Sequence, residues 1–243
     1  MTNLEYNITN PYTEKEIEEF EEWKVKSEYV IGQKKMGEEY KSITQWLKTM
    51  PNKDLERWRK NVGEEVADYI MKQGAERGTA VHEMIRRYLE LPYQTRRSEF
   101  SAEHGSFGEI PYEYRTKHCL HDGLFMNMLH DLQAIKDVFL LEDWLYSDKY
   151  KIFGKVDCIG QFYGYYAVID FKTKRTRREK MTTEEGIQLT AYALMFNEMF
   201  KKDIKDIVVV GASEDGGMWT IRKEIKFYKP LLEDLINYER KDS

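Results

Sequence analysis

The sequence predicts an α/β (α+β) fold, in which a sheet flanked by helices follows a helical N-terminal extension. Apolar residues recur at helical spacing in the first third of the 243-residue chain. Aromatic and β-branched residues are then concentrated in three consecutive segments, as expected of strands. A helix and a hairpin pattern follow. We therefore expect a helical extension over residues 1–74 and a core over residues 75–243, together in one compact domain.

The N-terminal extension contains charged segments with roughly helical apolar spacing, and Pro51 marks a break between the second and the third. These segments are Glu16–Lys26, Tyr40–Met50 and Val62–Lys72. At the start of the core, apolar side chains from Val81 to Leu89 recur at intervals of three and four. This spacing predicts an amphipathic helix over Ala75–Leu91, which ends before Pro92.

The middle of the core is expected to change from irregular structure to helix and then to strands. Residues Tyr93–His121 contain dispersed glycines and a proline, which predicts a surface loop, and a helix is expected over Leu124–Val138. The three strand segments are Phe139–Ser147, Tyr150–Gln161 and Tyr165–Thr173. A turn at Tyr163–Gly164 joins the last two into a hairpin.

The end of the chain returns to helix, hairpin and helix. Residues Glu184–Phe200 read as a helix, and Pro230–Tyr238 as a last one. Between them, Ile204–Ala212 and Met218–Phe227 are expected to pair as strands around a turn at Asp215–Gly216–Gly217.

Composition favours an intracellular protein with no membrane span. Hydrophobic residues make up 41% of the chain and charged residues 33%, and no apolar stretch approaches the length of a membrane helix. No targeting signal is seen, so we expect a cytoplasmic location, or the host-cell cytoplasm if the protein is viral. The net charge of −5 does not favour nucleic-acid binding, but the run Lys172–Lys180 is strongly basic.

The central motif is a pair of aspartates with a lysine. Asp157 closes the segment Gly154-Lys-Val-Asp, and Asp170 and Lys172 follow in Asp-Phe-Lys after twelve intervening residues. Side chains alternate along a strand, so Asp170 and Lys172 share one face and Asp157 on the preceding strand can lie beside them. Carboxylates that share a face repel unless a cation lies between them, which a divalent metal ion supplies. Taken alone, such a motif is more often a solvated strand face.

Three further features accompany the motif, and each has an ordinary structural explanation when taken alone. His82 lies in the first turns of the helix expected from Ala75. Gln188 and Tyr192 are four residues apart, hence on one face of the helix after the strands. Glu142 is a carboxylate within an otherwise apolar strand, where a charge needs a partner or an exposed position.

In this order the motifs GTxxH, strand Glu, GxxDxI, DxK and QxxxY resemble the RecB-type branch of the PD-(D/E)XK nucleases. The pattern is similar to the mitochondrial genome maintenance exonuclease and its phage-encoded relatives, and covers roughly residues 73–200. The resemblance implies a restriction-endonuclease-like core with a central mixed sheet. Some relatives of this branch carry an iron–sulfur cluster held by four cysteines; this chain has two, so no iron–sulfur cluster is expected.

The resemblance also implies roles for individual residues. The metal ligands would be His82, Asp157, Asp170 and the main-chain carbonyl of Phe171, with Mg²⁺ as the ion and Mn²⁺ as a substitute. The catalytic group would comprise Asp157, Asp170, Lys172, Glu142, Gln188 and Tyr192. Lys172 would hold or deprotonate the attacking water, Gln188 and Tyr192 would orient the catalytic loop and the DNA backbone, and Glu142 would support the site, through a second metal in one version. Local charge, rather than the resemblance, suggests that Lys174, Arg175, Arg177 and Arg178 follow the phosphate backbone, although such a run can also be only a solvated loop. Thr79 of the GTxxH motif completes the expected DNA-binding residues.

The expected function is therefore a metal-dependent DNA exonuclease acting on single strands or strand ends in replication, recombination or repair, alongside other proteins of those processes. Two alternatives remain open at this stage. One is a structure-specific or restriction-type endonuclease on the same fold. The other is a non-catalytic nucleic-acid-binding accessory protein, which would not need Asp157, Asp170 and Lys172 together.

The tyrosines of the Tyr163–Tyr166 turn are candidates for stacking unpaired bases, although packing at the sheet edge is their more ordinary role.

Overall fold

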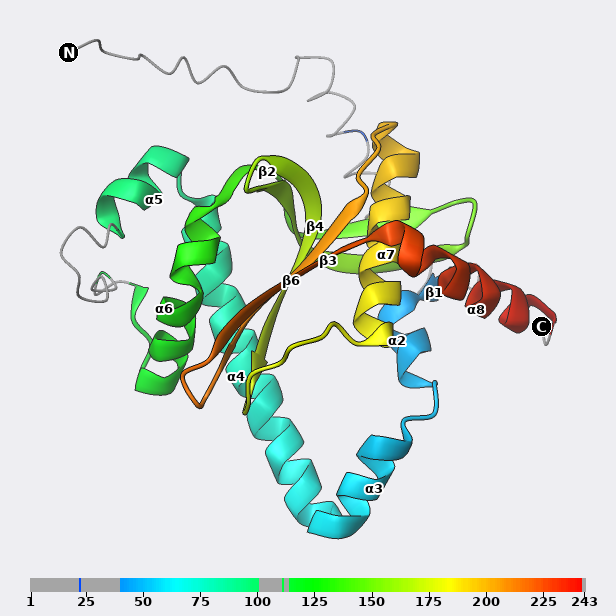
Figure 1. Cartoon of the computed structure of the whole chain (residues 1–243), viewed down its shortest axis with the longest axis horizontal. Helices are drawn as coiled ribbons and strands as arrows, with labels where there is room; N and C mark the ends of the chain where they lie inside the picture. The colour runs from blue at the N-terminus through cyan, green and yellow to red at the C-terminus, as the bar shows by residue number, and fades with distance from the viewer. Residues whose placement is uncertain (1–21, 23–39, 101–110, 112–113, 242–243) are drawn as a thin grey trace.

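The protein is a mixed six-stranded sheet with helices on both faces (Figure 1). The computed structural model describes residue 22 and residues 40–100, 111 and 114–241. The strands are β1 (Lys41–Ser42), β2 (Ile135–Ser147), β3 (Ile152–Phe162), β4 (Tyr165–Lys174), β5 (Asp206–Ser213) and β6 (Met218–Glu224). The helices are α2 (Ile43–Lys48), α3 (Lys53–Val62), α4 (Glu64–Glu90), α5 (Tyr93–Glu99), α6 (Cys119–Gln133), α7 (Thr183–Phe200), the short 3₁₀ helix η2 (Ile225–Phe227) and α8 (Lys229–Lys241).

The sheet has the order β1-β3-β4-β5-β6. Strand β2 pairs with the edge of β3 opposite β4. Strands β2, β3 and β4 form an antiparallel meander, whereas β4 and β5 are parallel and are joined through α7. The pairing of β3 with β4 ends at the register Cys158↔Ile169. Beyond this point β4 continues along β5 while its edge towards β3 has no strand partner. Asp157 and Asp170 lie at this separation, one residue beyond the last paired positions.

Each face of the sheet has its own apolar core. One core lies under α4 and α6 and includes Val81, Phe125, Ile169 and Phe171. The other lies under α2, α7 and α8 and includes Ile43, Val168, Tyr192 and Leu232. Burial on both faces explains the nearly continuous apolar sequence of β5, since neither face of that strand meets water.

The predicted fold class is confirmed, and the strands are confirmed with small shifts in their bounds. The Tyr163–Gly164 turn has a positive φ at both residues, as a two-residue hairpin turn of type I′ requires. Helix α7 begins with a capping box in which Thr182 and Glu185 satisfy each other's backbone N–H groups. The predicted hairpin of the last two strands is β5 with β6.

Several element predictions were wrong in detail. The helix expected over Leu124–Val138 ends at Gln133, and the strand begins at Ile135 because its apolar side chains continue the sheet's buried face. Part of the segment expected to be a loop, Tyr93–Glu99, is helix α5. The separate helices expected over Val62–Lys72 and from Ala75 are one helix, α4, so Gly74 does not interrupt it.

In the N-terminal part, the helix expected over Tyr40–Met50 shrinks to the six residues of α2, preceded by β1. Helix α3 was not predicted, although Asn52 caps it by accepting a hydrogen bond from the Leu55 N–H at 2.9 Å. The helix expected over Glu16–Lys26 lies outside the described residues, apart from residue 22. The division between residues 74 and 75 stays a prediction, and α4 runs across it. No helix among the described residues is long and apolar enough to span a membrane.

Candidate metal centre

The end of the β3–β4 pairing leaves backbone groups of β4 free to meet side chains, and this positions the site. The Phe171 N–H donates to a carboxylate oxygen of Asp157 at 3.0 Å. The carbonyl oxygen of the same residue lies 2.8 Å from Nε2 of His82 on α4. Backbone groups that would otherwise be buried without partners are thus satisfied by two of the predicted metal ligands. The side chain of Phe171 is buried in the core under α4, which fixes this part of β4.

Three side chains from three elements converge on one point. His82 Nδ1 lies 3.5 Å from a carboxylate oxygen of Glu142 on β2 and 3.6 Å from one of Asp157 on β3. One ligand atom from each of the three residues lies within 4.8 Å of the other two. Sequence reasoning placed Glu142 in a supporting role, whereas the structure brings it into this cluster as a candidate ligand beside His82 and Asp157.

Glu142 reaches the cluster through an unusual backbone conformation. Its φ of 51° is in the left-handed region, which non-glycine residues adopt infrequently and at a cost of order 1–3 kcal/mol. The preceding residue, Leu141, packs against the core under α4, and the side chain of Glu142 also meets α4 at His82. The left-handed residue interrupts the ordinary alternation of β2, so that two consecutive side chains face the same helix.

The acidic side chains of the cluster stabilise positive charge on the groups next to them. Burial lowers the pKa of His82, but hydrogen bonding to Glu142 and the charge of Asp157 outweigh it and raise that pKa to about 9. Burial raises the pKa of Glu142, yet its contacts with His82 and Lys155 bring it below the usual range. The imidazole is therefore held in its charged form by the two carboxylates at neutral pH.

Asp170 and Lys172 form a second, more buried part of the site. Lys172 Nζ lies 2.6 Å from one carboxylate oxygen of Asp170 and 2.5 Å from the other. Burial raises the pKa of Asp170 to about 6, even though Lys172 opposes the shift. Burial lowers the pKa of Lys172, but the charges of Asp170 and Asp157 outweigh it and leave that pKa above the usual value. Both side chains of the pair are thus charged at neutral pH.

The donor set fits a divalent cation. Mg²⁺ and Mn²⁺ prefer oxygen ligands, and Mn²⁺ also accepts an imidazole. His82, Glu142 and Asp157 supply one nitrogen and two carboxylates. Asp170 Oδ2 adds a further candidate: it is close to Lys172 but buried, and no described residue gives it a hydrogen bond of suitable geometry. Asp170 Oδ2 therefore remains able to accept a bond from an ion.

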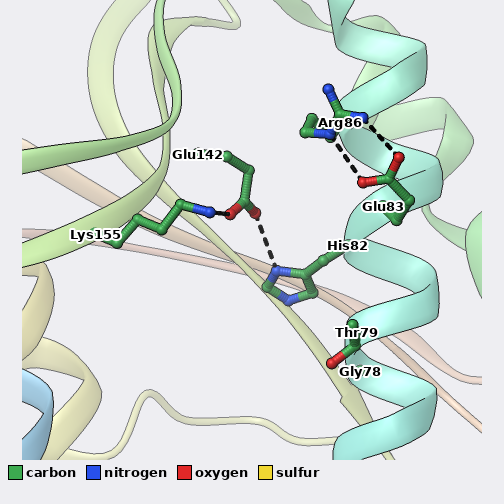
Figure 2. Close-up of a pocket in the computed structure, with 7 residues that line it drawn as sticks. All are labelled: Gly78, Thr79, His82, Glu83, Arg86, Glu142 and Lys155. Atoms are coloured by element: carbon green, nitrogen blue, oxygen red, sulfur yellow. Dashed lines mark hydrogen bonds and ion pairs between the residues drawn. The ribbon is translucent and has the colours of Figure 1, made fainter.

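A pocket of about 410 Å³ opens beside the cluster (Figure 2). Helix α4 forms one wall and strands β2 and β3 form the other. The lining residues are Gly78, Thr79, His82, Glu83, Arg86, Glu142 and Lys155. Thr79, predicted to bind DNA, is exposed on the α4 wall. Lys155 was missed by the sequence reasoning, although it lies two residues before Asp157 and strand alternation places both on one face.

Gln188 and Tyr192 lie under the sheet rather than in the pocket. Gln188 donates to the Tyr192 hydroxyl at 3.1 Å, and Tyr192 is 1% exposed. A Cβ at Gly154 would lie only 2.7 Å from the Tyr192 ring, so a glycine is required for this approach. The expectation that Tyr192 and Gln188 orient the catalytic loop and the DNA backbone stays a prediction, and the buried phenol could do so only through the elements packed on it. The position of Tyr192 supports β3 next to Asp157.

The predicted basic DNA-binding run divides into exposed and anchored side chains. Arg175 and Arg177 are exposed in the segment between β4 and α7. Arg178 is anchored instead, since its guanidinium lies 2.6 Å from Glu185 of α7. Lys174 is half-buried, and burial lowers its pKa, as does the nearby charge of Arg178. Only Arg175 and Arg177 therefore present freely accessible side chains among the four predicted cations.

The tyrosines of the β3–β4 turn lie away from the site. Tyr163 follows β3 and is six residues from Asp157, about 20 Å at the rise of a strand. Its hydroxyl donates to Asp131 at 3.0 Å, and the ring of Tyr165 packs against Arg222. Their observed contacts are those of sheet-edge packing, which was the more ordinary of the two expectations.

Comparison with known proteins gives a family for most of the chain. Residues 43–239 match the model of the PD-(D/E)XK nuclease superfamily, a range that contains every predicted site residue. A candidate exonuclease from Eubacterium rectale is 11% identical, with a TM-score of 0.49 over 84% of this chain and 79% of that one. The crystal structure of SSO0001 is 14% identical, with a TM-score of 0.39 over 83% and 77%. No curated protein matches significantly, and neither structural likeness is close enough to inform function.

Proposed function

The chain belongs to the PD-(D/E)XK nuclease superfamily, and we propose that it is a divalent-metal-dependent DNA exonuclease acting on single strands or strand ends. Nucleases of this superfamily use divalent metal ions. The observation that carries the proposal is the meeting of His82, Glu142 and Asp157 at the point where β3 and β4 separate. The Asp170–Lys172 pair lies beside them. Mg²⁺ is the proposed ion, with Mn²⁺ as a substitute.

In the proposed site, His82, Glu142, Asp157 and Asp170 hold the ion, together with the carbonyl oxygen of Phe171. Bound there, a divalent ion lowers the pKa of a water molecule and neutralises charge on the phosphate. Lys172 places an ammonium beside Asp170 and supports the extra negative charge that forms on the phosphate as the water attacks. Water adds to phosphorus, and the sugar oxygen leaves with a proton.

Other residues position these groups rather than touch the phosphate. Tyr192 and Gln188 pack beneath β3 at Gly154 and hold the strand that carries Asp157. Arg77 joins α4 to the opposite side of the site through Thr173 of β4, at 3.3 Å, and through Glu214.

Arg175 and Arg177, exposed just beyond β4, are proposed to attract the DNA backbone electrostatically.

His82 and Glu142 line a pocket of about 410 Å³, which has room for about one nucleotide, and this supports a substrate with a free or unpaired strand. The experiment that tests the proposal is a time course on end-labelled single- and double-stranded DNA with Mg²⁺, Mn²⁺ or EDTA. We expect mononucleotides or short products from the ends, and no cleavage in EDTA. Cleavage of closed circular DNA would favour the endonuclease alternative. Metal-independent binding with no cleavage under any condition would favour an accessory binding protein.

A further inference from the structure

Besides the His82 imidazole, the pocket has one cation on each wall: Arg86 on α4 and Lys155 on β3 (Figure 2). Their environments differ. Arg86 contacts both carboxylate oxygens of Glu83, at 2.8 and 2.6 Å, and also Glu90 of the same helix. Two carboxylates thus neutralise one guanidinium, and its fork of donors is occupied. Arg86 is built to stiffen the α4 wall rather than to attract an anion.

Lys155 is the more available of the two cations. Gly154 and Val156 on either side of it face the core under α7, so alternation turns Lys155 towards α4 and the pocket. Its side chain is 44% exposed, and Nζ lies 2.7 Å from Oε2 of Glu142. Glu142 also faces His82, so its charge is shared between two cationic partners. An ammonium has three donors, and this contact uses one of them.

We propose that Lys155 binds a substrate phosphate next to the one that is cleaved, on the β2 side of the metal centre. The inference rests on the proposed function. Lys172 lies on β4 and contacts Asp170, whereas Lys155 lies on β3 and reaches Glu142 of β2, so each lysine contacts a different carboxylate of the site. A strand crossing the cluster would meet one lysine at each of two neighbouring phosphates.

The charge balance of Glu142 gives a reason for Lys155 to change partner. A divalent ion held by His82, Glu142 and Asp157 takes up the carboxylate charge that Lys155 compensates in the absence of the ion. The ammonium is then free to donate to an oxygen outside the protein. The pocket of about 410 Å³ is large enough for one nucleotide at that position.

The test uses full-length protein with Asp170→Asn, to prevent cleavage, and fluorescent single-stranded oligonucleotides in Ca²⁺. Each oligonucleotide carries one neutral methylphosphonate linkage, moved along the strand. Adding Lys155→Ala should weaken binding by about tenfold and make the log–log salt dependence shallower by about 0.7, the value for one phosphate. At one position, the methylphosphonate should weaken binding to the Asp170→Asn protein but should not weaken binding further when Lys155→Ala is also present. Lys155→Arg should retain most of the affinity.

Lys226→Ala is the matched control, because Lys226 is also exposed and paired with a glutamate at 2.8 Å, but follows β6 at the far edge of the sheet. It should leave the salt dependence unchanged. If Lys155→Ala lowers only the affinity for Mn²⁺, with the salt dependence and the linkage profile intact, Lys155 merely anchors Glu142 and the inference is overturned. If the Asp170→Asn protein binds no DNA and the wild-type protein cleaves none, the proposed function itself fails.

Discussion

Two lysine–carboxylate pairs flank the same cluster, and they differ in burial. Asp170 and Lys172 on β4 form the inner pair, in which the side chains are 5% and 24% exposed. Glu142 and Lys155 form the outer pair, with 20% and 44% exposed, and open onto the pocket. In the inner pair each charge depends on the other because water cannot replace it. In the outer pair water and substrate can compete with the internal contact. The inner pair is therefore suited to hold its charges in place during the reaction, and Lys155 of the outer pair is suited to exchange Glu142 for a substrate oxygen.

The largest effect expected from this comparison is on activity. Asp170→Asn removes a ligand and the partner of Lys172 without changing side-chain volume, so we expect cleavage to fall by at least about a hundredfold. The same change leaves the Lys172 ammonium without its charged partner, so the melting temperature should fall while the protein stays folded at the assay temperature. Single-turnover cleavage of end-labelled DNA in Mg²⁺ measures the first effect, and thermal melting the second. Near-normal cleavage by preparations free of contaminating nuclease would exclude this site.

The second prediction compares how much breaking each pair lowers the free energy of unfolding. Lys172→Ala leaves the buried Asp170 beside Asp157 with no compensating cation, and should cost about 3 kcal/mol in the free energy of unfolding. Lys155→Ala breaks an exposed pair and should cost less than about 1 kcal/mol. Urea unfolding of both variants in EDTA provides the comparison. Equal losses would mean that burial does not distinguish the two pairs.

The third prediction concerns metal affinity. His82→Ala and Glu142→Gln should each weaken Mn²⁺ binding at least about tenfold in calorimetry, whereas Arg175→Ala should not. Because the pKa of His82 is raised to about 9, the metal must displace a proton from the ring at neutral pH. Binding should therefore release a proton, and the affinity should rise as the pH approaches 9. Unchanged Mn²⁺ affinity in His82→Ala would make His82 a structural residue of α4 only.

The smallest effect is expected outside both pairs, in the basic segment after β4. Replacing Arg175 and Arg177 by alanine should make the salt dependence of single-strand binding shallower by about 1.4, because each phosphate that is no longer neutralised accounts for about 0.7. Metal binding should be unaffected. Replacing Arg178 should instead lower stability, because it anchors Glu185 at the start of α7. If the salt dependence is the same in the double variant, the DNA follows another path.

Local sequence patterns were sufficient to predict the fold class and the succession of strands β2 to β6, and they pointed to the residues of the candidate site. Period-two apolar patterns and short turns fix strands such as β4 locally, and alternation places Asp170 and Lys172 on one face without knowledge of the rest. The GxxD and DxK motifs also placed Asp157 near Asp170, because a two-residue turn leaves few ways to pair the strands. The bounds of α4 were not predicted, since Gly74 lowers helix propensity but the packing of α4 overrides it.

Packing between distant elements determines which of these residues meet, and how. The left-handed backbone at Glu142 and the end of β3–β4 pairing at Ile169 shape the site, and the approach of His82 to Phe171 joins residues 89 positions apart. The burial of Tyr192 and the anchoring of Arg178 likewise depend on contacts between separate elements. Propensity and periodicity act over a few residues, whereas the charge state, exposure and partners of a side chain depend on every element packed around it.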